Sequence, residues 1–154
     1  MAARGYARST FDVDFLTTDT RVLQPSFWSE LDAVGARVDC RRGDSDDPLA
    51  GVARIRLADD AEFDIVVGRW KWEAGVVARA EPMHLAGVEV PVARTSDLIL
   101  LKLAAGGYLD LRDAAALLMS GDRTVLIRDV EQHLEDVRPD ARASWNTILT
   151  ETAE

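Results

Sequence analysis

The sequence predicts an α+β fold: a small mixed, mostly antiparallel sheet with helices packed on it and a helical C-terminal third. The first two-thirds of the 154 residues mix strand-like and helical segments, and the chain after Pro91 shows helical patterns only. A hydrophobic share of 47% is ordinary for a globular protein. The length suits one domain, so we expect residues 1–154 to form a single domain, with a mixed core over 1–92 and a helical part over 95–154.

The first part of the chain contains the predicted strands. Apolar and acidic side chains alternate over residues 9–16, which is the period of a strand, and the large apolar side chains place this strand near the middle of the sheet. Two later apolar segments flank an acidic turn and predict a hairpin. In chain order we expect a strand at 9–16, a helix at 25–34, strands at 36–41, 52–57 and 63–67, a helix at 70–80, and two short strands between 82 and 92.

Four helices are predicted after Pro91, beyond a candidate internal boundary at residues 91–96. Thr95 or Ser96 can cap the first of them, and the pair Gly106-Gly107 ends it. The expected ranges are 98–105, 110–119, 125–137 and 140–150.

Charge and cysteine content exclude several classes of protein. A net charge of -9 makes the chain a poor non-specific binder of nucleic acid or anionic membranes. Cys40 is the only cysteine, which fits a reducing compartment. No apolar run approaches the ~18 residues of a membrane span, and no signal peptide is visible. We therefore expect a cytoplasmic protein with no membrane partner.

Three aspartates form the candidate site. Asp12 and Asp14 are two residues apart in a predicted strand, so both carboxylates leave the same face. Asp64 lies inside an otherwise apolar strand, where a charge is costly unless something compensates it. Carboxylates on neighbouring strands are a natural way to hold Mg²⁺. The alternative is that these acids face solvent on the open side of the sheet.

The order of several motifs resembles the nucleotidyltransferase superfamily. The closest branch includes the abortive-infection E toxins and the minimal nucleotidyltransferases. Residues 4–15 (RGYARSTFDVDF) are similar to the Asp-x-Asp strand of that branch, and residues 63–68 (FDIVVG) to the strand with its third aspartate. Residues 96–106 (SDLILLKLAAG) and 110–113 (DLRD) are similar to its lysine-bearing helix and following Asp-x-x-Asp. The resemblance extends from about residue 4 to residue 118.

The resemblance implies a metal-dependent transfer of a nucleotide from a nucleoside triphosphate to a hydroxyl acceptor. Asp12, Asp14 and Asp64 would bind Mg²⁺ or Mn²⁺, and Asp64 would also help to remove the acceptor's proton. Lys102 would contact phosphate or pair with Asp110. Without the resemblance, Lys102 reads as a helix lysine that extends its ammonium group to solvent. The residues expected to contact the nucleotide are Arg8, Thr10 and Lys102.

One family feature is missing from the sequence. The resemblance leads us to expect a Gly-Gly or Gly-Ser turn before the Asp-x-Asp strand, where a helix N-terminus meets the triphosphate. Gly5 lies too late to replace that pair. We therefore expect either that the start codon has been placed too far downstream or that the chain is a shortened and inactive relative. In both cases residues 1–154 by themselves should bind nucleoside triphosphate weakly and turn it over poorly or not at all.

Three classes of function remain open. The chain is a nucleotidyltransferase, for which the resemblance allows a role as the toxin half of a toxin–antitoxin pair, or it is an inactive relative that binds nucleotide or a partner protein. The third class is a structural domain with a coincidental Asp-x-Asp. The acceptor could be RNA, a protein or a small molecule, and an antitoxin or a second copy of the chain could cover exposed apolar surface.

Overall fold

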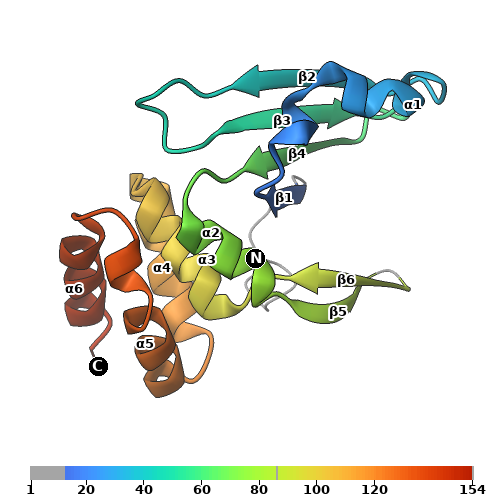
Figure 1. Ribbon diagram of the computed structural model, residues 1–154. Coiled ribbons are helices and arrows are strands. Elements are labelled where there is room, and N and C mark those ends of the chain that lie inside the picture. The colour runs from blue at the N-terminus through green and yellow to red at the C-terminus, as the bar shows by residue number, and fades with distance from the viewer. Residues whose placement is uncertain (1–12, 86, 154) are drawn as a thin grey trace. The chain divides into compact units, whose positions relative to one another are not determined.

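The computed structural model describes residues 13–85 and 87–153 (Figure 1). It has the expected α+β content, with a mostly antiparallel sheet and helices in the C-terminal part. The described chain divides into two compact units, a sheet unit up to Val77 and a helical unit from Ala78 onward. The single domain spanning both units stays a prediction.

The sheet unit is a four-stranded sheet in the order β1-β4-β3-β2. β1 pairs with β4 in parallel, while β4 pairs with β3, and β3 with β2, in antiparallel fashion. The predicted hairpin is β3–β4, and Asp60 in its turn has a left-handed φ of 64°. The strands are β1 (Val13–Thr17), β2 (Arg37–Arg42), β3 (Gly51–Arg56) and β4 (Glu62–Val67).

β1 is an edge strand among the strands that the structure describes, so the prediction of a central position was wrong. Its apolar side chains do not require a partner strand on both sides. Phe15 remains 48% exposed and packs edge-on against Phe63 of β4, with ring centroids 5.6 Å apart. A single neighbouring strand is therefore enough to order this aromatic pair.

The apolar face of the sheet is covered by short helical turns. These are the 3-10 turns η2 (Thr20–Leu23) and η3 (Pro25–Trp28) and one α-turn, α1 (Ser29–Asp32), in place of the continuous helix expected at 25–34. The indole of Trp28 donates to the carbonyl of Val22 at 2.7 Å, which ties η3 back to η2. Val22, Leu23 and Val67 form the core beneath these turns.

The helix α2 (Lys71–Ala78) follows β4. The buried carboxylate of Glu73 accepts hydrogen bonds from the backbone N–H groups of Arg69 and Trp70, at 2.6 and 2.7 Å. Because the first N–H groups of a helix have no partner within it, this contact fixes the start of α2.

The helical unit contains the two short strands expected between 82 and 92, β5 (Glu81–Leu85) and β6 (Val88–Val92), which pair in antiparallel fashion. The helices are α3 (Thr95–Ala105), α4 (Tyr108–Met119), α5 (Arg123–Glu131) and α6 (Ala141–Glu151), with the 3-10 turn η4 (Leu134–Asp136) between the last two. α3 contacts α4, α5 and α6. Its buried face, with Ile99, Leu100 and Leu103, packs in a core that includes Leu117 and Trp145.

Two details of these helices differ from the prediction, and one agrees. Neither Thr95 nor Ser96 is the cap of α3, because the helix already begins at Thr95 after Arg94. The helix expected at 125–137 ends at Glu131, and the backbone then leaves helical geometry at His133. The end of α3 agrees: Gly106 has a left-handed φ of 65° and donates its N–H to the carbonyl of Lys102 at 2.9 Å.

None of the helices in the described part of the chain is long and apolar enough to cross a membrane.

Candidate functional site

One row of charged residues crosses all four strands of the sheet unit. The strand registers align Asp14 of β1 with Asp64 of β4, Asp64 with Arg54 of β3, and Arg54 with Asp39 of β2. Residues aligned in this way point to the same face of a sheet. This charged row lies on the face opposite the side chains of Phe15 and Phe63. The sheet is therefore apolar on one face and ionic on the other.

Asp14 and Asp64 are the two expected metal ligands that the structure brings together. They are directly aligned on adjacent parallel strands. Asp14 is exposed, and the side chain of Asp64 is 23% exposed. Like charges in such positions destabilise a sheet unless a positive charge lies nearby. Asp12, Arg8 and Thr10 lie outside the described residues.

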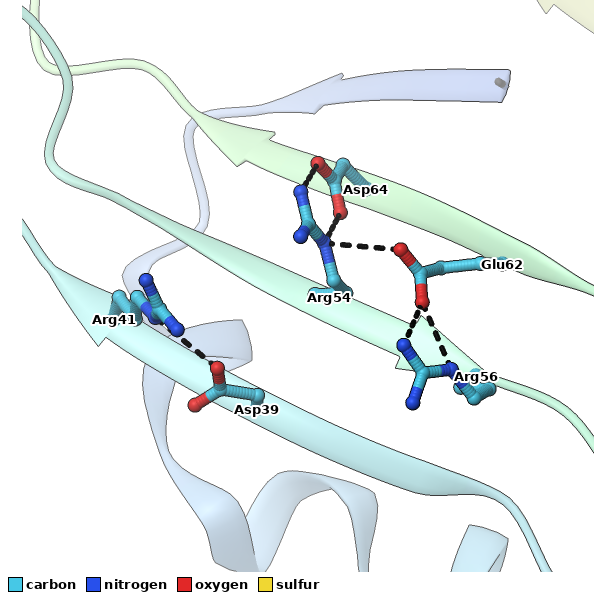
Figure 2. A network of polar contacts seen from close by, with 6 residues as sticks. All are labelled: Asp39, Arg41, Arg54, Arg56, Glu62 and Asp64. Carbon is cyan, nitrogen blue, oxygen red and sulfur yellow. Dashed lines mark hydrogen bonds and ion pairs between the residues drawn. The ribbon is translucent and has the colours of Figure 1, made fainter. Parts of the chain in front are cut away.

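Arg54 supplies the positive charge at Asp64 (Figure 2). Its Nε donates to Oδ1 and its Nη2 to Oδ2, both at 2.8 Å. This is the two-bond geometry in which a guanidinium binds a carboxylate most strongly. The hydrogen bonds from Arg54 lower the pKa of Asp64 and outweigh burial, which acts in the opposite direction. Like-charge repulsion predicts a raised pKa in this cluster; for Asp64 the direction is the reverse.

Glu62 extends the ionic network along β4. Its Oε1 lies 3.4 Å from Nε of Arg54, and its Oε2 accepts from Arg56. Figure 2 shows both arginines reaching from β3 to the carboxylates of β4, while Asp39 pairs with Arg41 on its own strand at 3.1 Å. Arg54 and Glu62 were missed by the sequence reasoning. The sequence contains the signal, because Arg54 and Arg56 stand opposite Asp64 and Glu62 across the hairpin.

The donor set of the site suits a hard divalent cation. Mg²⁺ and Mn²⁺ prefer carboxylate oxygens, and Asp14 and Asp64 supply them from two aligned strands. Within residues 13–85 and 87–153, no group of three or more His, Cys, Asp or Glu side chains is arranged to hold a metal ion. Arg54 already neutralises Asp64, so a cation at this carboxylate would compete with the guanidinium.

Lys102 lies in the helical unit, near the end of α3. Its Nζ is 2.8 Å from Oδ1 of Asp110 and 3.2 Å from Oδ2 of Asp113, both on α4. The predicted pairing with Asp110 is confirmed. Burial by itself would lower the pKa of Lys102, but the hydrogen bonds to the two aspartates outweigh it and raise the pKa. The ammonium group is therefore held by carboxylates instead of extending freely into solvent.

Comparisons with known proteins add no family assignment. No family model matches the chain, and no curated protein is significantly similar to it.

Proposed function

We propose that the chain is a metal-dependent nucleotidyltransferase that transfers a nucleotide from a nucleoside triphosphate to a hydroxyl acceptor. The observation that supports this most directly is the alignment of Asp14 with Asp64 on adjacent parallel strands, facing the same side. Two carboxylates in this arrangement are suited to share a divalent cation. The resemblance of residues 4–15 and 63–68 to the family's metal-binding strands points to the same reaction.

The roles of the residues follow from their chemistry. Asp14 and Asp64, with Asp12, would hold Mg²⁺ or Mn²⁺. A bound divalent cation in such a site neutralises charge that develops on the phosphate oxygens. A lowered pKa keeps Asp64 ionised near neutral pH, which suits a ligand and makes the carboxylate a weak general base. We therefore assign Asp64 the role of positioning the metal and the substrate, rather than that of removing the acceptor's proton.

Lys102, Arg8 and Thr10 are proposed to contact the nucleotide. The ammonium group of Lys102 is held by Asp110 and Asp113, so a direct phosphate contact would require it to leave one of them. RNA, a protein or a small molecule would serve as the acceptor. A role as the toxin half of a toxin–antitoxin pair, with an antitoxin or a second copy as partner, depends on the resemblance alone.

Transfer of label tests this function. The full chain is incubated with Mg²⁺, α-labelled nucleoside triphosphates and total RNA or cell extract, and compared with its Asp14→Asn and Asp64→Asn variants. Asp39→Asn is the matched control, since Asp39 belongs to the same charged row but pairs with Arg41. Label transfer by the wild type and Asp39→Asn, with loss in the other two, supports the proposal. Equal labelling by all four proteins contradicts it.

A second candidate function is binding without turnover. The contact between Arg54 and both oxygens of Asp64 favours it, because this ion pair stabilises the carboxylate with no metal present. In that case the chain would be an inactive relative that binds nucleotide or a partner protein. Saturable nucleotide or Mn²⁺ binding without label transfer would distinguish it from the enzyme.

A further inference from the structure

The helical unit contains a cavity of about 400 Å³ whose lining carries more basic than acidic side chains. Three arginines line it, from three places in the chain: Arg79 before β5, Arg94 before α3, and Arg128 on α5. Ser96 and Asp129 also contribute to its wall. The volume is in the range of small-molecule sites. In a chain of net charge -9, three arginines around one cavity form a local concentration of positive charge.

Arg79 is held rigidly at the cavity. Its Nη2 lies 2.5 Å and its Nε 3.2 Å from Oδ1 of Asp97, whose side chain is only 2% exposed. A buried carboxylate of this kind fixes the position of the guanidinium before any ligand arrives. No hydrogen bond to the remaining terminal nitrogen, Nη1, is found among the described residues. Arg79 can therefore donate to a second anion without releasing the first.

Arg94 and Arg128 are held much more loosely. Nε of Arg94 is 3.1 Å from Glu81, and these side chains are 45% and 46% exposed. Arg128 pairs with Asp129, the next residue in the chain, and is 64% exposed. Exposed ion pairs contribute little to stability. An anion with more charge than one carboxylate can therefore attract both guanidinium groups away from these pairs.

Ser96 adds a hydroxyl to the cavity wall. The residue is 6% exposed and lines the cavity. No protein hydrogen bond to its hydroxyl is found among the described residues, and the hydroxyl is not one of their fully buried, unpartnered atoms, so solvent in the cavity can reach it. A hydroxyl without a protein hydrogen-bond partner at the wall of this cavity is suited to donate to an anionic oxygen.

We propose that this cavity binds the phosphate or pyrophosphate group of a small phosphorylated ligand. Guanidinium groups match phosphate oxygens with paired hydrogen bonds, and three of them surround a volume that a phosphorylated small molecule can occupy. Arg79 supplies a fixed donor, Arg94 and Arg128 close on the ligand, and Ser96 donates its hydroxyl. The site uses none of the carboxylates of the sheet unit, so it does not depend on the proposed transferase activity.

Binding of simple phosphates to the full chain tests the proposal. Inorganic phosphate, pyrophosphate and AMP are titrated by calorimetry in buffer with EDTA at constant low ionic strength. Because EDTA removes divalent cations, the phosphate probes cannot bind through a metal ion held by Asp14 and Asp64. Saturable binding of at least one probe is expected. Tighter binding of AMP than of phosphate would identify a nucleotide as the ligand class, whereas tightest binding of pyrophosphate would identify a diphosphate group.

The matched variants distinguish a specific binding site from a general attraction of anions by positive charge. Arg94→Gln with Arg128→Gln should raise the Kd of the tightest probe at least about tenfold, since charge-assisted hydrogen bonds are lost. Ser96→Ala should weaken binding less. Arg142→Gln is the control, because Arg142 pairs with Glu131 and Glu135 and does not line the cavity. No saturable binding by the wild type, or an equal loss in Arg142→Gln, would overturn the proposal. Far-ultraviolet circular dichroism verifies that each variant is folded.

Discussion

Arg54 donates to both carboxylate oxygens of Asp64 from the neighbouring strand, at 2.8 Å each. This contact decides the electrostatics of the candidate site. Asp64 has Asp14 directly beside it on β1 and Arg54 directly beside it on β3. The acid is therefore placed between a like charge and a counter-charge on one face of the sheet. Its pKa follows the counter-charge, because the hydrogen bonds from Arg54 outweigh the other contributions.

Acid should destabilise the chain in part through this ion pair. The pKa of Asp64 is lower in the folded protein than in the unfolded chain. Its contribution to stability is therefore present above the ordinary aspartate pKa of about 4 and is lost as the pH falls through the lower folded value. Asp64→Asn should reduce the loss of stability between pH 6 and pH 2. Urea unfolding across this range measures the loss of stability, and Arg54→Gln should reduce that loss to a similar extent. An unchanged pH dependence in both variants would contradict this assignment.

Mn²⁺ should compete with Arg54. The Arg54→Gln variant lacks the guanidinium that binds the carboxylate of Asp64. Mn²⁺ should therefore bind this variant several-fold more tightly than the wild type and raise its melting temperature further. Arg56→Gln is the matched control, because Arg56 is on the same strand and face but pairs with Glu62. Adding Asp14→Asn to Arg54→Gln should abolish the gain. If Arg56→Gln tightens binding equally, the effect is one of net charge only.

The ion pairs of Lys102 should stabilise the helical unit. Lys102→Met removes the ammonium group that pairs with Asp110 and the buried Asp113. We expect a loss of about 1–2 kcal/mol at pH 7, less than for a fully buried pair because solvent partly screens the charge. The pKa of Lys102 is raised, so this stabilisation is complete below about pH 10 and disappears as the pH rises through the folded value.

Urea unfolding at pH 7 and pH 11 measures this effect. The control is Lys71→Met, since Lys71 is the only other lysine in the chain and is exposed on α2. A loss of stability in Lys71→Met as large as that in Lys102→Met would refute the role of the ion pairs.

Gly106→Ala should destabilise the turn between α3 and α4. Gly106 has a φ of +65°, and an added Cβ would lie 1.8 Å from the guanidinium of Arg138. A left-handed backbone costs a non-glycine residue about 1–2 kcal/mol, whereas the guanidinium is the end of a flexible side chain and can move aside at little cost. Gly87→Ala separates the two causes, because Gly87 has a φ of +83° and an added Cβ there meets nothing within 4 Å. Thermal unfolding should show losses of similar size for the two variants, and a much larger loss for Gly106→Ala would show that Arg138 cannot move aside.

The sequence by itself determined the features that depend on neighbours in the chain. Alternating side chains and an acidic turn were enough to predict the β3–β4 hairpin, because period and turn chemistry are local. Gly106 marked the end of α3 for the same reason, since few other residues adopt its φ. The pairing of Lys102 with Asp110 was one of two contacts that the family resemblance implied for this lysine, and the structure shows it.

Only the tertiary structure decided how distant segments pair. Nothing local to residues 9–16 specifies that β1 joins the sheet at its edge beside β4, because hydrophobicity favours burial without naming a partner strand. That pairing places Asp14 beside Asp64, and the hairpin register then sets Arg54 against Asp64. The basic cavity likewise combines Arg79, Arg94 and Arg128 from a wide span of the chain. Long-range packing brings these arginines together, and no local pattern of the sequence records it.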